Sequence, residues 1–392
     1  HMIREIIMSL ISAILQSLTS IIKMSGEVVR IEVLVAIGAV IVLLVILVNK
    51  YRITRPNGRV LKKKLGTLER IVILTHSNPD PDAMASALGI AHIAESVGVA
   101  VTIQYPGEIR HQENRAFKTI LGTTMEKIES DEDIAGGAIF LVDHNVARGF
   151  KGAEKLIPYA VIDHHPGEGR GVGFTDIRPE YGSCSAIVTE YFSDMGAVLE
   201  EVGQPKKGRI RLPKSVATGL LFGILTDTKN FTKGASEADF SASAYLYDGI
   251  DEDSLDRIAN PEVDAEVLEI IASSILKREA RGPFVISNVG EVSNIDALSQ
   301  AADELLNLEG TTAVVVYGQK GATTHIKGRS RDDRVHMGDT LQAALAHIPE
   351  ANAGGKPKAG AGQITASTKK QNREYCKELP ERLFTAMTGE VQ

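Results

Sequence analysis

Cysteine is scarce in this chain of 392 residues. Its two cysteines, Cys184 and Cys376, form no disulfide framework, and their spacing does not fit a zinc finger. We interpret both as buried or incidental thiols. Internal repeats and low-complexity tracts are also missing. A composition of 43% hydrophobic and 24% charged residues excludes wholesale disorder, and the length is sufficient for two or three folded units.

Acidic residues are absent between Asn49 and Leu68, where seven basic residues gather. These are Lys50, Arg52, Arg55, Arg59, Lys62, Lys63 and Lys64. Because the whole chain carries −7 and this segment carries +7, the remainder carries −14. A surface that binds a long polyanion needs many cations to neutralise phosphates. The charge therefore argues against long nucleic acid as a partner.

An apolar run occupies residues 31–49. Every residue from Val33 to Val48 is apolar or glycine, and residues 31–48 form an 18-residue stretch interrupted only by Glu32. This length is near the lower limit for crossing a bilayer, and a buried core helix is the alternative. The basic residues that follow are a positive-inside signature. We therefore predict a single-pass helix in the cell membrane, with the rest of the chain in the cytoplasm.

Residues 1–30 precede this run. Their isoleucines and leucines recur at helical three-and-four spacing, with polar residues mostly on the other side. The pattern predicts an amphipathic helix that lies on the bilayer or pairs with a second copy to form a homodimer. A second membrane span stays open as an alternative. Residues 50–64 are predicted to be a basic juxtamembrane linker.

Beyond residue 64, short apolar runs alternate with helical patterns. The first block has predicted strands at 70–75, 99–104, 138–142 and 160–162, and predicted helices at 83–96 and 185–194. The second block has predicted strands at 284–289, 312–317 and 323–327, and predicted helices at 295–306 and 338–347. The alternation predicts an α/β fold in which a mostly parallel sheet carries helices on both faces. We place the first domain at 65–258, a helical connector at 259–281, and a smaller α/β domain at 282–392.

Polar residues gather where the predicted strands of the first block end. The three clusters are His76 with Asp80 and Asp82; Asp143 with His144 and Asn145; and Asp163 with His164 and His165. Asp227 follows another apolar run and is a fourth candidate. A single such residue is more often a cap or turn residue. Because ligands bind outside the carboxyl ends of parallel strands, the four together predict one shared metal site.

The donor types in these clusters restrict the metal. Carboxylates and imidazoles without thiolates suit Mn²⁺ or Mg²⁺ better than structural zinc. About six ligands suggest two ions bridged by a carboxylate, as in many phosphate-cleaving enzymes.

In this order, the clusters resemble the four motifs of the DHH phosphoesterases, a family named for the triplet matched here by Asp163-His164-His165. The resemblance spans residues 65–258. It implies a catalytic domain with two Mn²⁺ ions, for which Mg²⁺ or Co²⁺ are substitutes. The implied ligands are His76 and Asp80 for one ion, Asp82, His164 and Asp227 for the other, and Asp143 as the bridge. His165 would face the scissile phosphate, while Asp163 would orient the imidazoles.

The second block carries two further segments of interest. Gly328-Arg329-Ser330-Arg331 closes a predicted strand, and residues 354–362 are rich in glycine. Taken alone, these segments fit a charged turn and a flexible loop as well as an anion site. Together they resemble the DHH-associated C-terminal domain over residues 282–383. The resemblance implies that the second nucleotide of a substrate binds Arg329, Ser330, Arg331, Gly354, Gly355 and Lys356. Lys356 stands where family members commonly have histidine, which leaves base specificity and the choice between cyclic and linear substrates open.

Ser183-Cys184-Ser185 opens a predicted helix. Its first backbone N–H groups would suit a phosphate, and ordinary N-capping explains the serines equally well.

These features predict a membrane-anchored, manganese-dependent phosphodiesterase that hydrolyses cyclic di-AMP, linear dinucleotides, or both. The expected reaction is attack on phosphorus by a hydroxide that bridges two ions. A short-oligonucleotide or single-strand exonuclease of the same superfamily is the nearest alternative. A manganese inorganic pyrophosphatase and a catalytically silent nucleotide sensor are the others.

Overall fold

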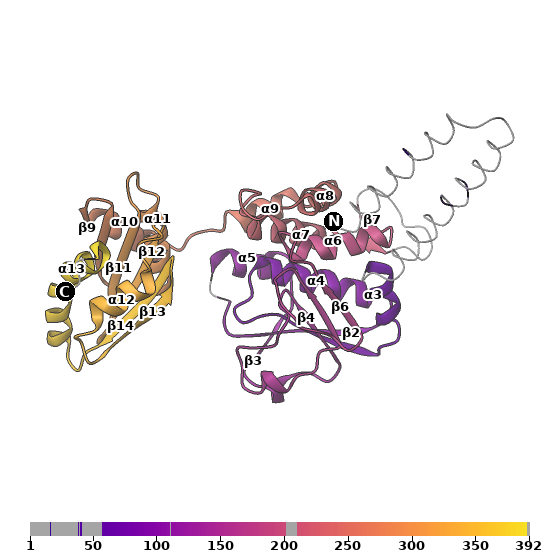
Figure 1. The fold of residues 1–392 in the computed structure, drawn as a ribbon, viewed down its shortest axis with the longest axis horizontal. Coiled ribbons are helices and arrows are strands. Elements are labelled where there is room, and N and C mark those ends of the chain that lie inside the picture. Colours follow the sequence, from indigo (N-terminus) through magenta and orange to yellow (C-terminus); the bar gives the residue numbers. More distant parts are fainter. Residues whose placement is uncertain are drawn as a thin grey trace. The chain divides into compact units, whose positions relative to one another are not determined.

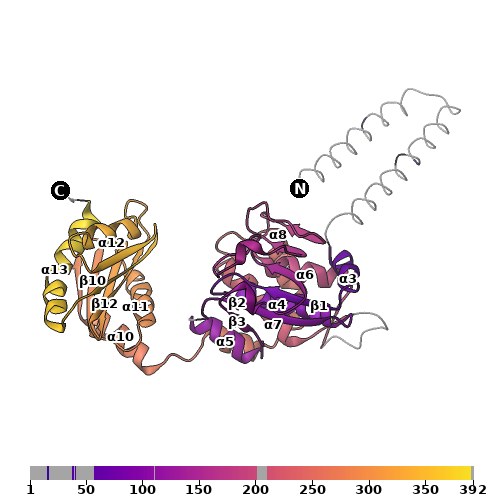
Figure 2. The same ribbon diagram turned by 90° about the horizontal axis from the view of Figure 1, so that it is seen from below.

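The computed structural model describes residues 57–389, with gaps at 110 and 201–209, and three isolated positions, Gln16, Gly38 and Val40. The predictions for residues 1–30 and 31–49 lie outside this described part, apart from those three positions. None of the helices in the described part combines the length and the hydropathy needed to cross a membrane. The chain divides into two compact units, His1–Ala259 and Asn260–Gln392 (Figures 1 and 2).

A six-stranded sheet forms the centre of the first unit, with strand order β3-β2-β1-β4-β5-β6 and all neighbours parallel. The strands are β1 (Arg70–Leu74), β2 (Ala100–Pro106), β3 (Glu126–Ile128), β4 (Ala138–Val142), β5 (Ala160–Asp163) and β6 (Phe174–Ile177). The four predicted strands correspond to β1, β2, β4 and β5. Their continuous apolar sequences are expected for strands that are covered on both faces.

The helices that the structure describes in the first unit lie on one face of this sheet (Figure 1). They are α3 (Gly58–Leu65), α4 (Pro81–Glu95), α5 (Gln112–Ile120), α6 (Cys184–Asp194), α7 (Lys214–Asp227), α8 (Glu237–Tyr247) and α9 (Glu252–Ala259). A smaller apolar cluster of loop residues, including Ala147, Phe150 and Leu156, covers the other face. The prediction of helices on both faces is therefore wrong for this unit. Pro166 and four glycines between β5 and β6 disfavour a helix there.

The second half of the predicted basic linker is helical. Helix α3 begins after Asn57, whose side chain caps the backbone N–H groups of Arg59 and Val60. Leu61 and Leu65 are fully buried in the core of the first unit. The basic side chains of the last turn of α3 therefore belong to this unit, and residues 58–64 are not a free linker.

The second unit is also built on a six-stranded sheet, in the order β13-β14-β12-β11-β10-β9. Its strands are β9 (Arg278–Arg281), β10 (Phe284–Glu291), β11 (Ala313–Lys320), β12 (Thr323–Ser330), β13 (Ala351–Lys356) and β14 (Ala359–Thr365). Its helices are α10 (Ala265–Leu276), α11 (Asp296–Leu306), α12 (Met337–Leu345) and α13 (Lys369–Thr388). Helices α10 and α11 pack against one face of the sheet, and α12 and α13 pack against the other.

Two segments of the second unit differ from their sequence-based predictions. Residues 259–281, predicted to be a connector, contain α10 and β9, and both belong to the fold of this unit. The glycine-rich segment 354–362 is not a loop, because it lies within the antiparallel pair β13–β14. Glycine leaves room for close packing here: a Cβ on Gly338, in the first turn of α12, would lie 2.6 Å from the carbonyl oxygen of Gly355.

Candidate metal centre

The site lies at the point in the sheet where the order of strand addition reverses, between β1 and β4. Strands β1 and β4 are neighbours, and the connections that follow them lead to opposite halves of the sheet. His76 lies two residues after β1, Asp143 directly follows β4, and His164 directly follows β5. Such a switch point opens a crevice at the carboxyl ends of parallel strands. The predicted convergence of the three clusters is therefore observed.

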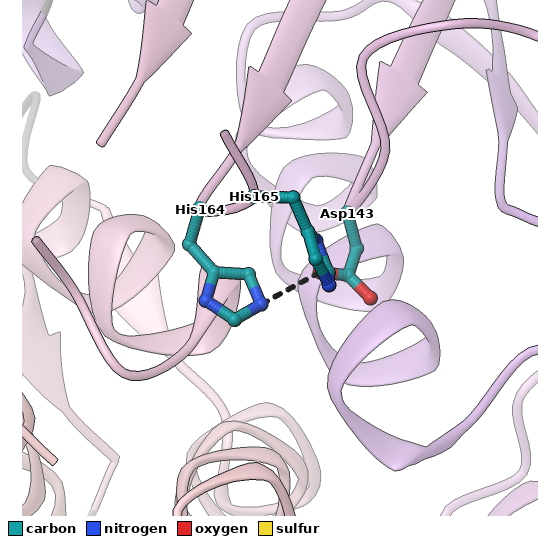
Figure 3. Close-up of side chains that lie close together, drawn as sticks. All are labelled: Asp143, His164 and His165. Atoms are coloured by element: carbon teal, nitrogen blue, oxygen red, sulfur yellow. Dashed lines mark ion pairs between the residues drawn. The ribbon is translucent and has the colours of Figure 1, made fainter. Parts of the chain in front are cut away.

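Three overlapping groups of side chains could hold metal ions. They are His76 with Asp80 and Asp143; Asp82 with His164 and Asp227; and Asp143 with His164 and His165. Asp143 belongs to the first group and also faces His164 of the second. Its Oδ2 is 3.4 Å from Nε2 of His76. Its Oδ1 is 3.4 Å from Nε2 of His164 (Figure 3). The two oxygens of one carboxylate thus face two ligand sets, which is the arrangement predicted for a bridging residue.

Unpaired polar atoms in this site fit a bound cation. Oδ1 of Asp143 and Nε2 of His164 are buried, and neither has a hydrogen-bond partner among the described residues. Burying polar atoms without partners costs free energy, which a coordinated ion would offset. Asp143 also has a left-handed backbone conformation, with φ of 64°, which is strained for a residue other than glycine. A donor set of imidazoles and carboxylates suits Mn²⁺ or Mg²⁺.

The electrostatics of the site indicate the same need for positive charge. Burial and the neighbouring charge of Asp82 raise the pKa of Asp143 well above its ordinary value. Burial also raises the pKa of Asp82 to about 6. Burial opposes protonation of His76, but the carboxylates of Asp143 and Asp80 outweigh it and raise the His76 pKa to about 11. Without a cation, the carboxylates therefore compete for protons.

Asp227 reaches the site from a helix and not from the end of a strand. It is the last residue of α7, and its Oδ2 lies 3.3 Å from Nε2 of His164. The apolar run before it is a helix buried against α4 and α6, and periodicity cannot distinguish such a helix from a buried strand. The chain leaves this helix through three consecutive left-handed residues, Lys229, Asn230 and Phe231.

The N-terminus of α6 holds a predicted metal ligand. The backbone N–H groups of Cys184 and Ser185 each donate to Asp82, with 2.8 Å to Oδ2 and 2.8 Å to Oδ1. Of the two explanations left open, phosphate binding by these N–H groups is therefore disfavoured, because the Asp82 carboxylate occupies them. Ser183 acts as an ordinary N-cap and accepts from the N–H of Ala186. The positive end of the helix dipole stabilises the Asp82 carboxylate and fixes its plane.

Asp163 orients one of the two neighbouring histidines. Its carboxylate is fully buried and accepts from Nδ1 of His165, from the His165 backbone N–H, and from Nδ2 of Asn145. The His165 side chain is 57% exposed, so it can meet a ligand. Nδ1 of His164 instead faces the carbonyl oxygen of Tyr181, at 3.2 Å. The hydrogen bonds thus agree with the prediction that Asp163 orients the imidazoles for His165 only. Sequence reasoning placed Asn145 in a strand-end cluster without a role, and it did not identify Tyr181.

In the second unit, strand register determines which of the predicted substrate-binding residues lie on the same face of the sheet. Arg329 pairs with Ala359 and Ala359 pairs with Lys356, so all three lie in one row on the same face of the sheet. Ser330 points to the other face, is 3% exposed, and bonds to the backbone of Asp332. Alternation along β12 adds Lys327 and His325 to the face of Arg329. Sequence reasoning overlooked Lys327 because face membership follows from register.

The remaining predicted residues of this group have local partners. Arg329 forms two hydrogen bonds with Asp303 on α11, and Arg331 donates to Asn307. Gly355 has φ of 152° and packs against the first turn of α12. Gly354 pairs with Ala361 in the hairpin. The group therefore divides into three parts: Arg329 and Lys356 in one row, Ser330 and Arg331 with local partners, and glycines that permit close backbone packing.

Comparison with known proteins agrees with both units. The profile of the DHH family, N-terminal domain, matches residues 70–224, and that of the DHHA1 domain matches residues 281–381. Together the two profiles cover more than half of the chain. The solved structure of an exopolyphosphatase-related protein from Bacteroides fragilis has a TM-score of 0.55 and 17% identity, and covers 83% of this chain and 95% of that one. This likeness concerns the fold.

Curated relatives match this chain over about one half to two thirds of their own length. An uncharacterized protein of Methanocaldococcus jannaschii is 34% identical over 324 residues, which are 82% of this chain and 64% of that protein. The cyclic-di-AMP phosphodiesterase GdpP of Geobacillus thermodenitrificans is 27% identical over 77% of this chain and 48% of its own length. A probable manganese-dependent inorganic pyrophosphatase of Streptococcus suis is 24% identical over 62% of this chain and 67% of its own length. This chain thus spans less than two thirds of the length of the first two relatives. Its motifs and its two matched domains show that it belongs to the DHH family and carries a DHHA1 domain.

Proposed function

We propose that the protein is a metal-dependent phosphodiesterase with two Mn²⁺ ions, acting on cyclic di-AMP, its linear product, or both. The observation that carries this proposal is the position of Asp143, whose two carboxylate oxygens face two separate ligand sets. The chemistry that two bound divalent ions supply is a water of lowered pKa and neutralisation of charge on the phosphoryl oxygens. The likeness to a cyclic-di-AMP phosphodiesterase supports the choice of substrate.

In this proposal, His165 and Asp163 act together on the leaving group. The hydrogen bond from Nδ1 of His165 to Asp163 raises the pKa of the imidazole and fixes its orientation. The protonated imidazole can then donate from Nε2 to the leaving oxygen of the phosphodiester. The row of Arg329 and Lys356 offers cations to the phosphates of a dinucleotide, which supports a small anionic substrate.

The test uses the full chain, stripped of metal and resupplied with Mn²⁺. Cyclic di-AMP, linear di-AMP, inorganic pyrophosphate and a long single strand are offered separately, and products are separated by chromatography. We expect Mn²⁺-dependent loss of a dinucleotide that is absent in Asp143→Ala and retained in the control Asp131→Ala, whose carboxylate pairs with Lys155. Turnover of only the long strand or only pyrophosphate would contradict the substrate proposal. Tight dinucleotide binding without turnover would indicate a sensor.

We also propose that residues 31–49 anchor the protein in the cell membrane with both units in the cytoplasm, and that residues 1–30 lie on the bilayer or self-associate. The apolar run and the basic residues after it support this proposal. Fractionation of cells that express the full chain should place it with the membranes after a carbonate wash. A variant with Leu34→Lys and Leu44→Lys should move to the soluble fraction, and unchanged membrane retention would contradict the anchor.

A further inference from the structure

A cluster of polar side chains, most of them buried, lies near His164. It consists of Asp176 on β6, Arg178 and Tyr181 in the segment after β6, and Glu190 and Tyr191 on α6; we call it the Arg178 cluster. The guanidinium of Arg178 donates to both oxygens of Asp176, at 2.8 and 2.7 Å. It also donates to Glu190 and to the hydroxyl of Tyr181, each at 2.9 Å. No sequence motif indicated this cluster.

Further hydrogen bonds and a ring contact join the members of the cluster. The hydroxyl of Tyr181 donates to Glu190, and that of Tyr191 donates to Asp176 at 2.6 Å. Arg178 is 8% exposed, and its guanidinium lies over the ring of Tyr181 at 5.0 Å. The planar guanidinium matches this geometry because it can bind one carboxylate through two N–H groups and reach further acceptors with another. A shorter or more flexible cation could not replace all of these contacts.

Tyr181 connects this cluster to the candidate metal centre. Its backbone carbonyl oxygen faces Nδ1 of His164 at 3.2 Å. A carbonyl oxygen only accepts, so Nδ1 of His164 carries the proton and Nε2 presents its lone pair. That Nε2 is the buried atom that faces the carboxylates of Asp143 and Asp227.

The backbone around this carbonyl is fixed at several points. The N–H of Tyr181 donates to the carbonyl of Arg178, and the N–H of Arg178 donates to the carbonyl of Asp163. The N–H of Gly182 donates to Asp239, at 2.8 Å. The Arg178 cluster adds the side-chain restraint, since it holds the Tyr181 ring and hydroxyl against α6.

We infer that Arg178 and Tyr181 are positioning residues for metal binding, which hold His164 in the tautomer and orientation that present Nε2 to an ion. Neither residue touches the ion or the substrate; both act through the carbonyl oxygen of Tyr181. Partners of this kind orient a histidine ligand, and their loss typically weakens metal binding tenfold or more. The inference deepens the metal centre on which the proposed function rests.

The variants Tyr181→Phe and Arg178→Lys test this inference. Tyr181→Phe keeps the ring and the backbone carbonyl but removes the hydroxyl that joins Arg178 and Glu190. Arg178→Lys keeps the positive charge but removes the planar guanidinium, whose several N–H groups reach Asp176, Glu190 and Tyr181 together. The matched control is Tyr245→Phe, which removes a hydroxyl that donates to the carbonyl of Ala197 in the same unit.

Ion binding is measured on the metal-free full chain by calorimetric titration with Mn²⁺, and the ligand field is recorded from the absorption spectrum with Co²⁺. We expect one ion to bind about tenfold more weakly in Tyr181→Phe, with an altered Co²⁺ spectrum, and a larger loss in Arg178→Lys. The ion held by His76 and Asp80 should change less, and Tyr245→Phe should match the parent. If Arg178→Lys does not fold, Tyr181→Phe decides the question.

Two outcomes would overturn the inference. One is ion affinities and a Co²⁺ spectrum in Tyr181→Phe that equal those of the parent, even if its stability or activity falls, because the cluster would then be purely structural. The other is a parent chain that binds no divalent ion, which would overturn the metal centre as well. A parent that binds two ions but cleaves no phosphodiester would contradict the proposed function alone.

Discussion

The carboxylate of Asp163 holds the imidazole of His165, with 3.0 Å between Oδ1 of Asp163 and Nδ1 of His165. Asp163 is fully buried, whereas His165 is more than half exposed. A carboxylate that solvent does not reach therefore fixes the orientation of the exposed imidazole ring. This relationship separates the roles of two adjacent histidines, because His164 takes its orientation from the carbonyl of Tyr181.

Replacing this carboxylate should change the titration of His165. Asp163 raises the pKa of His165 by hydrogen bonding and by its charge, so in the metal-free variant Asp163→Asn the pKa should fall below that of the parent. Nuclear magnetic resonance titration of the imidazole signals measures the shift. The signal of His347, in the second unit, is the internal control and should not move. A His165 pKa that stays at the parent value would show that Asp163 does not set it.

The carboxylate of Asp143 should lower the stability of the metal-free protein, although it enables metal binding. Its carboxyl is 3% exposed and has a pKa well above the ordinary value, so ionising it in the folded state is unfavourable. At neutral pH without metal, Asp143→Asn should raise the free energy of unfolding by about 1 kcal/mol. The gain should shrink as the pH falls toward the ordinary pKa of an aspartate, because the parent carboxyl is then protonated. Denaturant unfolding at several pH values measures both effects.

With added Mn²⁺, the parent should become more stable than Asp143→Asn, which is the reverse of their order without metal. An ion that binds only the folded state stabilises the parent, but Asp143→Asn lacks the bridging carboxylate and should gain far less. Asp131→Asn, which changes a partly buried carboxylate that pairs with Lys155 away from the site, should behave like the parent. Equal stabilisation of Asp143→Asn and the parent by Mn²⁺ would exclude a bridging role.

Close backbone packing in the second unit should make one glycine indispensable. A Cβ at Gly338 would lie 2.6 Å from the carbonyl oxygen of Gly355, which cannot move away like the end of a flexible side chain. We expect Gly338→Ala to cost about 1–3 kcal/mol of stability. Thermal unfolding measures the loss. The control is Gly354→Ala in the same hairpin, where the new methyl would meet only the flexible end of Gln342 at 3.6 Å; an equal loss there would contradict the argument.

The basic row should contribute to substrate affinity. Lys356 is exposed and lies in the row of Arg329, so Lys356→Ala should raise the KM for a dinucleotide about tenfold, with a smaller change in kcat. Steady-state kinetics with cyclic and linear di-AMP measures the change. Lys370→Ala removes an equal charge from α13 and should leave KM near the parent value. If both variants change KM equally, general charge and not the row is responsible.

Local patterns in the sequence determined the strands and the order of the site residues. The apolar runs of β1, β4 and β5 are continuous because both faces of these strands are covered, and such runs are readable without a structure. Since parallel strands align their carboxyl ends, His76, Asp143 and His164 could be placed at one edge from chain order alone. Donor chemistry then restricted the metal.

Longer-range packing decided the features that were missed or wrongly assigned. Asp227 comes from a buried helix, the N–H groups of Cys184 and Ser185 hold Asp82, and Arg178 reaches His164 only through Tyr181. Each of these contacts joins segments that are distant in the chain, and neither segment's sequence indicates the other as its partner.

Strand register separated residues that the sequence had grouped together. Arg329 and Ser330 are adjacent in the chain, but they point to opposite faces of β12, while Arg329 and Lys356 share a face through β14. Side chains alternate along a strand, and pairing fixes which residues of distant strands lie side by side. The sequence alone therefore determined the chemical groups and the strand ends, whereas tertiary packing decided which of those groups meet.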